Sequence, residues 1–567
     1  MTATVLQAIE QRLAAGHGER TAFTSLPEGT IASAISADWV TLHRRALGMA
    51  AVLSARGARG KAVLLALPSG LDFVRALLGC WYAGAIAVPV SLPRHQRVKH
   101  RLDRIAADAG AGFAIATGDT RDRLCGGLPD SSPLRRMQWI EPPASGPATF
   151  TPHVTLPADT AILQYTSGST GDPRGVIVSH ANLVANSRQI AAACGHSPES
   201  TVGGWLPLFH DMGLIGLVIQ SLWTGNHCVF MPPERFLMRP WLWLEMIQHY
   251  NVHSSPAPNF AYDLCCQRVD DARRAKLDLR CWHNALNGSE PVRGATLDRF
   301  ADAFAASGFD RSAFFPCYGL AEATLFVTGP DRRLGPAARR TADAVPVAPG
   351  ASDGHVGCGR PGPGTEVAIV DPHTLRRIAG EGIGEIWVSG ESVAHGYWNN
   401  PAATAATFGA RLDGDATKTW LRTGDLGFFA GGELYITGRL RELIILAGRN
   451  LFPVDLERTA EAAHPAIAAS GVAAFSIDAI GGERLIVAAE IDRGLKHESL
   501  DAAAITAAVR TAITAEHDVA PQEVVLLRPG ALPRTTSGKL SRRQARGAYL
   551  DQTLERYEGA THVGSPA

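Results

Sequence analysis

A short run of the sequence, YTSGSTGDPRG from Tyr165 to Gly175, concentrates groups that can bind phosphate. It contains four aliphatic hydroxyls, three glycines and one guanidinium, which are those of Thr166, Ser167, Gly168, Ser169, Thr170, Gly171, Arg174 and Gly175. Glycines let backbone N–H groups approach an anion closely, and hydroxyls add further donors. The apolar residues 161–163 and 176–178 predict a strand on each side, so the run is expected to be the loop between them.

The spacing of this run excludes a Walker phosphate loop, because no Lys-Ser or Lys-Thr pair follows the glycines. A cluster of serine, glycine and threonine can also be a flexible linker, and this alternative stays open. The flanking strands and the single cation favour a phosphate site, of the kind that holds a nucleotide.

Further polar groups follow apolar stretches on glycine-rich turns. His210 and Asp211 favour a ligand pocket, although a buried histidine more often only packs in a core. Glu322 is a candidate ligand for Mg²⁺, which takes carboxylate and phosphate oxygens, but a solvated carboxylate is an equal alternative. Asp425, on an expected tight turn at 421–427, could accept both hydroxyls of a ribose. Lys539 stands in a C-terminal loop, LPRTTSGK.

The composition narrows the class of protein. With 54 basic and 54 acidic side chains among 567 residues, the chain gives no electrostatic reason to expect nucleic acid as a partner. Its nine cysteines form no C-x-x-C pair and are expected to be reduced, with Cys265 and Cys266 as buried hydrophobes more readily than as a reactive pair. No apolar run reaches about 18 residues, so we expect no membrane span and a cytoplasmic protein.

Apolar periodicity predicts the elements that must position these groups. It predicts strands over 61–67, 85–90, 113–116 and 384–388, and helices over 40–57, 71–83, 94–109 and 180–193. Alternating strands and helices with continuously apolar strands are typical of parallel sheets covered by helices. Residues 119–152 are expected to form a polar surface connection.

The alternation restarts after residue 441. Strands are predicted over 443–446, 471–476, 484–490 and 522–527, and helices over 453–464 and 501–516. This pattern predicts a separate α+β unit of a common domain size.

The chain resembles the adenylate-forming superfamily of acyl-CoA synthetases and related ligases over about residues 20–550. The resemblance rests on eight motifs in order, YTSGSTGDPRG, WLPLFHDMGLIG, NGSEPV, YGLAEATLF, GEIWVSGESVAHGYW, LRTGDLGF, GRLRELIILAGRNLFPVDLE and LPRTTSGKL. Within the superfamily the chain is most similar to the fatty acyl-AMP ligases, through HDMGLIG, NGSEPV, YGLAEATLF and GRNLFPVDLERTAEAAHP.

The resemblance implies an α/β fold. Its large domain, residues 1–437, would have parallel-rich sheets covered by helices, followed by a hinge at 438–441 and a small mobile α+β domain at 442–567. The implied activity is ATP-dependent conversion of a fatty or related carboxylic acid to its acyl-adenylate, with release of pyrophosphate and with Mg²⁺ as cofactor. The acyl group would then pass to the phosphopantetheine thiol of an acyl carrier protein, often in polyketide or nonribosomal peptide biosynthesis. Coenzyme A is the alternative acceptor, and an inactive acyl- or nucleotide-binding protein is the alternative of another class.

The resemblance also assigns roles to individual residues. The loop from Thr166 to Gly175 would contact the β- and γ-phosphates of ATP. The adenine and acyl pocket would be bordered by Asn287, Gly288, Ser289, Tyr318 and Gly319. Glu322 and Thr166 would hold Mg²⁺, Thr324 would lie near the α-phosphate, and Asp425 and Arg439 would bind the ribose. His210 and Asp211 would stand near the substrate carboxylate, Arg441 at the hinge, and Lys539 would act in adenylation.

The chain departs from the family pattern at a few positions. Arg174 stands where the family usually has lysine; the charge is kept, and a guanidinium can bind phosphate through two N–H groups. Arg441 stands where lysine or aspartate is more usual. Fatty acyl-AMP ligases carry an extra segment in the large domain, which we expect at 329–355. The apolar run 214–222, with Gly213 and Gly216, could line an acyl tunnel or form a packed helix.

Overall fold

The computed structural model describes residues 3–92, 96–143, 150–166, 173–330, 355–446, 449–479, 482–495, 500–535 and 539–557. Within these ranges, none of the helices combines the length and the apolar character that a membrane span requires. All nine cysteines are described and none forms a disulfide. Cys265 is buried as predicted, whereas Cys266 is only partly buried.

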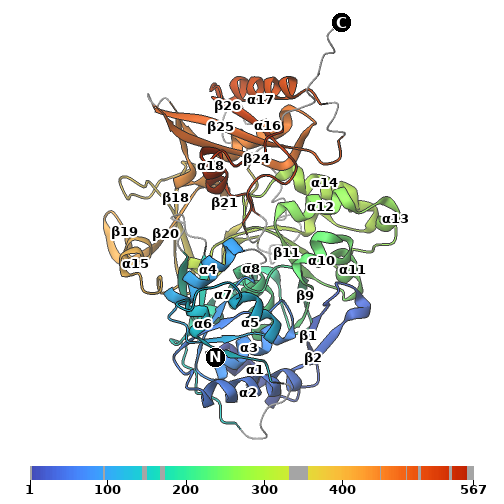
Figure 1. The fold of residues 1–567 in the computed structure, drawn as a ribbon, viewed down its shortest axis with the longest axis vertical. Coiled ribbons are helices and arrows are strands. Elements are labelled where there is room, and N and C mark those ends of the chain that lie inside the picture. The colour runs from blue at the N-terminus through green and yellow to red at the C-terminus, as the bar shows by residue number, and fades with distance from the viewer. Residues whose placement is uncertain are drawn as a thin grey trace.

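Two mostly parallel sheets form the larger part of the molecule (Figure 1). The first has the strand order β6 (Gln138–Ile140), β5 (Phe113–Ile115), β3 (Ala62–Leu65), β4 (Ile86–Pro89), β7 (Thr160–Thr166) and β8 (Arg174–Ser179). The second has the order β13 (Phe314–Pro316), β12 (Asn284–Asn287), β11 (Ser254–Ala257), β9 (Thr201–Gly204), β10 (His227–Phe230), β1 (Thr21–Ser25) and β2 (Ile35–Asp38). Only the β7–β8 and β1–β2 pairs of these two sheets are antiparallel among the described residues.

Helices cover these sheets and bury their apolar strands. The main core joins α1 (Val5–Ala14), α2 (Trp39–Ala55), α3 (Leu71–Tyr82) and α7 (His180–Cys194) to both sheets. The side chains of Trp39 and Trp81 are fully buried there. The central strands β3 and β4 are continuously apolar and buried, which is typical of parallel sheets covered by helices. The predicted α/β class of fold is therefore confirmed.

The segment 119–152 was wrongly predicted to be only a surface connection. It contains α5 (Gly118–Cys125), α6 (Pro133–Arg136) and β6, which extends the first sheet. The Thr117 side chain accepts a hydrogen bond from the N–H of Thr120 and so caps α5. Leu124 and Leu134 are buried although their neighbours are polar. The two buried leucines and the helix cap at Thr117 stabilise helical structure in this otherwise polar segment.

The predicted tight turn at 421–427 is also wrong. These residues lie inside β20 (Asp415–Ala430), which pairs with β18 (Gly384–Gly390) and β21 (Glu433–Arg439) in an antiparallel sheet with β17 (Thr365–Val370) and β19 (Ala410–Leu412). Gly424 has a φ of 71°, and the pairing with β21 shifts register between Leu426 and Gly427. An irregularity of this kind bends a strand without ending it.

A C-terminal unit, residues 444–557, has its own sheet and core, at the top of Figure 1. Its sheet consists of β24 (Ile467–Ala479), β25 (Gly482–Ile491) and β26 (Glu523–Leu527), with a hairpin of β22 (Ile444–Leu446) and β23 (Arg449–Leu451) beside it. The helices α16 (Pro453–Ala463) and α17 (Ala502–His517) pack on one face of the sheet. The unpredicted helix α18 (Arg542–Leu550) packs on the alternate residues of β24 and β25, hence on the other face.

Candidate active site

Two of the residues predicted to bind the nucleotide, Tyr318 and Arg439, donate hydrogen bonds to the carboxylate of a third, Asp425. Asp425 of β20 is buried, and its Oδ2 accepts a hydrogen bond from the Tyr318 hydroxyl at 2.7 Å. Its Oδ1 accepts one from Nε of Arg439 at 3.1 Å. Arg439 lies directly opposite Asp425 in the β20–β21 pair, so the antiparallel register itself brings these two charges together. The charge of Asp425 raises the pKa of Arg439 against the effect of burial.

The candidate metal ligand lies next to this carboxylate. Glu322 is on η5 (Ala321–Ala323), directly after β14 (Tyr318–Gly319), and its Oε1 accepts a hydrogen bond from the Tyr397 hydroxyl at 2.8 Å. Burial raises the pKa of Glu322, and the hydrogen bond from Tyr397 and the positive charge of Arg439 oppose this rise. Gly319 is required in β14, because a Cβ there would lie 1.9 Å from the carbonyl oxygen of Leu325.

Two predicted site residues have strained backbones. Thr324 is fully buried and has φ 69° and ψ −63°, and the N–H of Leu325 donates to the carbonyl of Ala323 across it. This γ-turn with positive φ is rare and costly for a β-branched residue. The Thr324 hydroxyl donates to the carbonyl of Ser392 at 2.6 Å. Ser289 has a φ of 75°. Strain of this kind persists where the surrounding structure enforces it, often at ligand sites.

The NGSE turn follows the end of β12. The Asn287 side chain donates to Oδ1 of Asn259 at 3.0 Å, and its own Oδ1 is buried without a hydrogen-bond partner among the described residues. Gly288 packs against Cys317, whose carbonyl oxygen would lie 3.0 Å from a Cβ at that position. The Ser289 hydroxyl contacts Sδ of Met212 at 3.2 Å.

The side chains of His210 and Asp211 are in direct contact with each other. Nδ1 of His210 lies 2.6 Å from Oδ1 of Asp211. Burial by itself would raise the pKa of Asp211, but the charge and hydrogen bond of His210, with the charge of Lys539, lower it to about 2. Burial lowers the pKa of Lys539, and the negative charges of Asp211 and Glu290 oppose this lowering. The ammonium of the C-terminal lysine therefore lies among carboxylates of the N-terminal part.

The strands on both sides of the predicted phosphate loop are confirmed. Thr166 ends β7, Arg174 begins β8, and the two residues pair across the antiparallel ladder. The Arg174 guanidinium carbon lies 5.3 Å from the centre of the Tyr397 ring. The residues between, Ser167, Gly168, Ser169, Thr170 and Gly171, lie outside the described part of the chain, as do residues 331–354 of the expected extra segment.

The apolar run after Asp211 packs into the main core. It forms α8 (Asp211–Gly213), the π-helix η2 (Leu214–Ile219) and α9 (Gln220–Thr224). Six of its apolar side chains are fully or almost fully buried there, which are Leu214, Ile215, Leu217, Val218, Ile219 and Leu222. Gly213 is held against the backbone of Pro207, 2.3 Å from where a Cβ would lie. This packing favours the packed-helix alternative over an acyl tunnel for these side chains.

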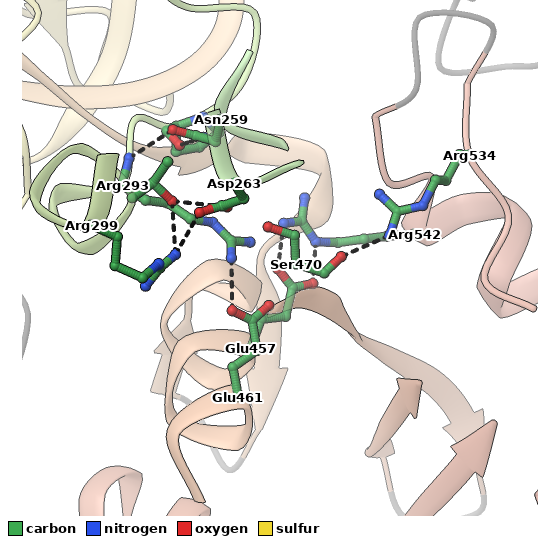
Figure 2. A network of polar contacts seen from close by, with 11 residues as sticks. Asn259, Asp263, Arg293, Arg299, Glu457, Glu461, Ser470, Arg534 and Arg542 are labelled. Carbon is green, nitrogen blue, oxygen red and sulfur yellow. Dashed lines mark hydrogen bonds and ion pairs between the residues drawn. The ribbon is translucent and has the colours of Figure 1, made fainter. Parts of the chain in front are cut away.

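A network of charged groups joins the C-terminal unit to the rest of the molecule (Figure 2). Nη1 of Arg293, just before α14 (Gly294–Phe304), lies 2.7 Å from Oε2 of Glu461 on α16. Asn259, at the start of α12 (Asn259–Arg268), accepts a hydrogen bond from the N–H of Arg293. The side chains of Arg293 and Glu461 are only 18% and 16% exposed, so water screens this pair little.

One guanidinium of the C-terminal unit, that of Arg542 on α18, contacts two other elements. Arg542 donates to both oxygens of Glu457 on α16, at 2.6 and 2.7 Å, and Glu457 is 1% exposed. A third bond, of 2.6 Å, runs from Nη1 of Arg542 to Glu442. Glu442 ends η8 (Leu440–Glu442), which also contains the predicted hinge residue Arg441.

Comparison with known proteins shows the family to which the chain belongs. The family described as "AMP-binding enzyme" matches residues 10–398, more than half of the chain. The chain belongs to the AMP-binding enzyme family. A second family, described as "Disco-interacting protein 2-like, AMP domain", matches residues 441–558 of this AMP-binding enzyme.

Several relatives resemble this AMP-binding enzyme over nearly their whole length. It is 40% identical to the medium-chain-fatty-acid–acyl-carrier-protein ligase JamA of Moorena producens, over 94% of the chain and 92% of the relative. It is 35% identical to a putative fatty-acid–CoA ligase, fadD25 of Mycobacterium tuberculosis, over 92% and 93%. The crystal structure of a fatty acyl-adenylate ligase from Legionella pneumophila, with acyl adenylate and pyrophosphate, matches with a TM-score of 0.72, 32% identity and coverage of 98% and 97%. The predicted resemblance to fatty acyl-AMP ligases is confirmed.

Sequence reasoning missed Tyr397 and Glu290 in this AMP-binding enzyme. Tyr397 belongs to the motif GEIWVSGESVAHGYW, which carried the resemblance without a role for any of its residues. Glu290 belongs to NGSEPV, and its Oε1 is buried without a partner among the described residues. The sequence did contain a signal for Glu290, because its carboxylate directly follows Asn287, Gly288 and Ser289, which were predicted to border the pocket.

Proposed function

We propose that this enzyme converts a fatty acid and ATP to an acyl-adenylate and passes the acyl group to the phosphopantetheine thiol of an acyl carrier protein. The observation that carries the proposal is the buried Asp425, whose carboxylate accepts hydrogen bonds from Tyr318 and Arg439. The charges of Asp211 and Glu290, which oppose the lowering of the pKa of Lys539 by burial, support a place for its ammonium near this site. The names of the Moorena and Legionella relatives support the acyl carrier acceptor and the acyl-adenylate respectively.

The reaction requires one carboxylate oxygen of the substrate to attack the α-phosphorus while pyrophosphate leaves. All the reacting groups are negatively charged, so the enzyme must hold them in line and offset their charge. We assign the ribose hydroxyls to Asp425 and Arg439, and the charge that develops at the α-phosphate to Lys539. The loop from Thr166 to Gly175 would hold the β- and γ-phosphates. No nucleophile of the protein is needed.

The residues at the site fit a nucleotide-borne Mg²⁺. Mg²⁺ in nucleotide sites takes one or two carboxylates and completes its coordination with phosphates and water. Glu322 supplies one carboxylate and Thr166 one hydroxyl, and among the described residues no group of three or more histidine, cysteine or acidic side chains forms a metal cage. When bound, Mg²⁺ would offset the charge of the phosphates.

We further propose that residues 1–437 form a large domain, residues 438–441 a hinge and residues 442–567 a small domain. The separate buried cluster of the C-terminal unit supports this division, and so does the start of the second family match at residue 441. Rotation about the hinge at Arg441 would withdraw Lys539 after adenylation and admit the thiol.

The substitution Lys539→Ala tests this assignment. We expect release of pyrophosphate with a fatty acid and ATP to fall at least about a hundredfold, because the ammonium acts on charge in the transition state. Transfer from added acyl-AMP to the carrier thiol should stay within about twofold. Lys418→Ala removes a surface ammonium paired with Glu366 and should change neither step. Equal loss of both half-reactions would contradict the role of Lys539.

The acceptor requires an experiment of its own. The enzyme is incubated with ATP and a panel of carboxylic acids, and the products are identified by mass spectrometry with a carrier protein, with coenzyme A, or with neither. Acyl-AMP that is consumed only by the carrier protein supports the proposal. Abundant acyl-CoA would contradict the proposed acceptor and indicate an acyl-CoA synthetase. If no acid yields acyl-AMP, the result would indicate a binding protein that has no adenylation activity.

A further inference from the structure

The segment 394–398 lies between the strand after the phosphate loop and the candidate metal ligand. On one side, the N–H of Trp398 donates to the carbonyl of Gly175 at 2.7 Å, and the N–H of Ile177 in β8 donates to the carbonyl of Gly396 at 2.9 Å. On the other side, the N–H of Ala394 donates to the carbonyl of Glu322 at 2.9 Å. The backbone of this segment therefore fixes β8 relative to η5.

The side chain of Tyr397 makes the same connection between charged groups. Its hydroxyl donates to Oε1 of Glu322 at 2.8 Å, and the guanidinium carbon of Arg174 lies 5.3 Å from its ring centre. The ring is 7% exposed and packs edge-on against Phe408 with centroids 5.2 Å apart. One neutral side chain thus contacts both the cation that ends the phosphate loop and the carboxylate that would hold Mg²⁺.

We propose that Tyr397 is a positioning residue, which orients Glu322 toward the metal that accompanies the nucleotide and keeps Arg174 from pairing with Glu322. The proposal rests on the proposed function. A glutamate carboxylate rotates easily about its last torsion, and one fixed hydrogen bond to Oε1 removes that freedom and leaves Oε2 for the metal. Without the hydroxyl, Arg174 and Glu322 are opposite charges beside one ring, and a direct ion pair would withdraw both from the phosphates.

The test compares Tyr397→Phe with Tyr549→Phe. Tyr397→Phe keeps the ring and removes only the hydroxyl. Tyr549→Phe removes a bond of the same chemistry, from Tyr549 to Glu523 at 2.5 Å, between α18 and β26. Calorimetry without any fatty acid gives the affinity for ATP in Mg²⁺ and the affinity for AMP in EDTA. Tyr397→Phe should weaken binding of Mg²⁺-ATP about tenfold and leave AMP binding within about twofold, since partners of a metal ligand affect the metal site selectively. Tyr549→Phe should change neither affinity.

A double-mutant cycle with Glu322→Gln separates positioning from packing. If Tyr397 acts through the carboxylate, Tyr397→Phe has no further effect on Mg²⁺-ATP affinity in the Glu322→Gln background. The inference is overturned if Tyr397→Phe leaves Mg²⁺-ATP affinity unchanged, if it weakens AMP equally, or if the two effects simply add. A wild-type enzyme that binds Mg²⁺-ATP but forms no acyl-AMP would refute the proposed function alone, because these affinities are measured without substrate acid.

Discussion

At the scale of single residues, the site depends on a few charges that compensate one another at short range. Asp425 accepts from Tyr318 and Arg439 and is thereby held in one orientation before any nucleotide arrives. A carboxylate fixed in this way can accept two ribose hydroxyls without loss of side-chain freedom on binding. If Asp425 binds the ribose as proposed, the nucleotide sugar would meet a preorganised acceptor.

Asp425→Asn should weaken ATP and AMP alike. The amide keeps the size of the side chain but removes the charge and one acceptor, and hydrogen bonds to a charged group contribute about 1.5–3 kcal/mol. We expect both dissociation constants to rise about tenfold or more. Calorimetry with AMP in EDTA and with ATP in Mg²⁺ measures them. A change confined to ATP would show that Asp425 acts on the phosphates or the metal and not on the ribose.

The residue scale also shows the limits of the sequence. The resemblance paired Asp425 with Arg439, and the strand register places them opposite each other, but the spacing of the two along the chain does not predict a contact. Tyr397 is an uncharged aromatic residue, and from the sequence alone it is expected to pack in the core. The positive φ of Thr324 leaves no mark in the sequence, because threonine favours the opposite conformation.

At the scale of elements, one ion pair joins the residue before α14 to α16 of the C-terminal unit. The Arg293–Glu461 pair is largely buried, and burial raises the pKa of Glu461 while the charge of Arg293 opposes the rise. Oε1 of Glu461 has no hydrogen-bond partner among the described residues. Burial of this pair costs desolvation free energy, which exposure of the pair to water would recover.

Glu461→Gln should slow adenylation more than thiol transfer. The amide keeps a weaker hydrogen bond to Arg293, and a loss of about 1 kcal/mol in the arrangement that presents Lys539 corresponds to about a fivefold lower rate. Transfer from added acyl-AMP should be unchanged or faster. Separate assays of the two half-reactions measure this, with Glu366→Gln as control because that carboxylate pairs with Lys418 at the surface. Parallel loss of both half-reactions would contradict this expectation.

Elements with strong apolar periodicity were predicted from the sequence, and those held by a few contacts were not. Helices such as α2, α3 and α7 agree with their predicted positions within a few residues, since their buried faces repeat at helical spacing. In β20 a glycine and polar residues indicated a turn, but antiparallel partners on both sides keep the chain extended. Pairing of that kind is long-range information, which local patterns do not contain.

At the scale of the whole molecule, buried histidines make the folded state sensitive to acid. Burial lowers the pKa of His180, His196, His227 and His355 to about 4. In the unfolded chain these groups take up a proton near pH 6.5. Between pH 6.5 and 4 the unfolded state therefore binds more protons, and the free energy of unfolding falls as the pH falls.

His180→Gln should reduce this sensitivity. His180 is 2% exposed and packs edge-on against Trp81, so protonation in the folded state is strongly opposed. The wild-type Tm should fall from pH 6.5 to pH 4, and the variant should lose less, because it lacks a group worth about 3 kcal/mol at pH 4. Thermal unfolding followed by tryptophan fluorescence at several pH values measures both slopes. Equal slopes would mean that His180 takes up its proton without unfolding.

The three hydrogen bonds of Arg542 connect the C-terminal region that carries Lys539 to η8, the segment that precedes the C-terminal sheet. The guanidinium stands three residues after the lysine, and its partners are the last residue of η8 and a buried glutamate of α16. These hydrogen bonds join Arg542, three residues after Lys539, to α16 and to Glu442 beside the predicted hinge. We therefore expect Lys539, Arg542 and α16 to move together if the C-terminal unit rotates after adenylation as proposed.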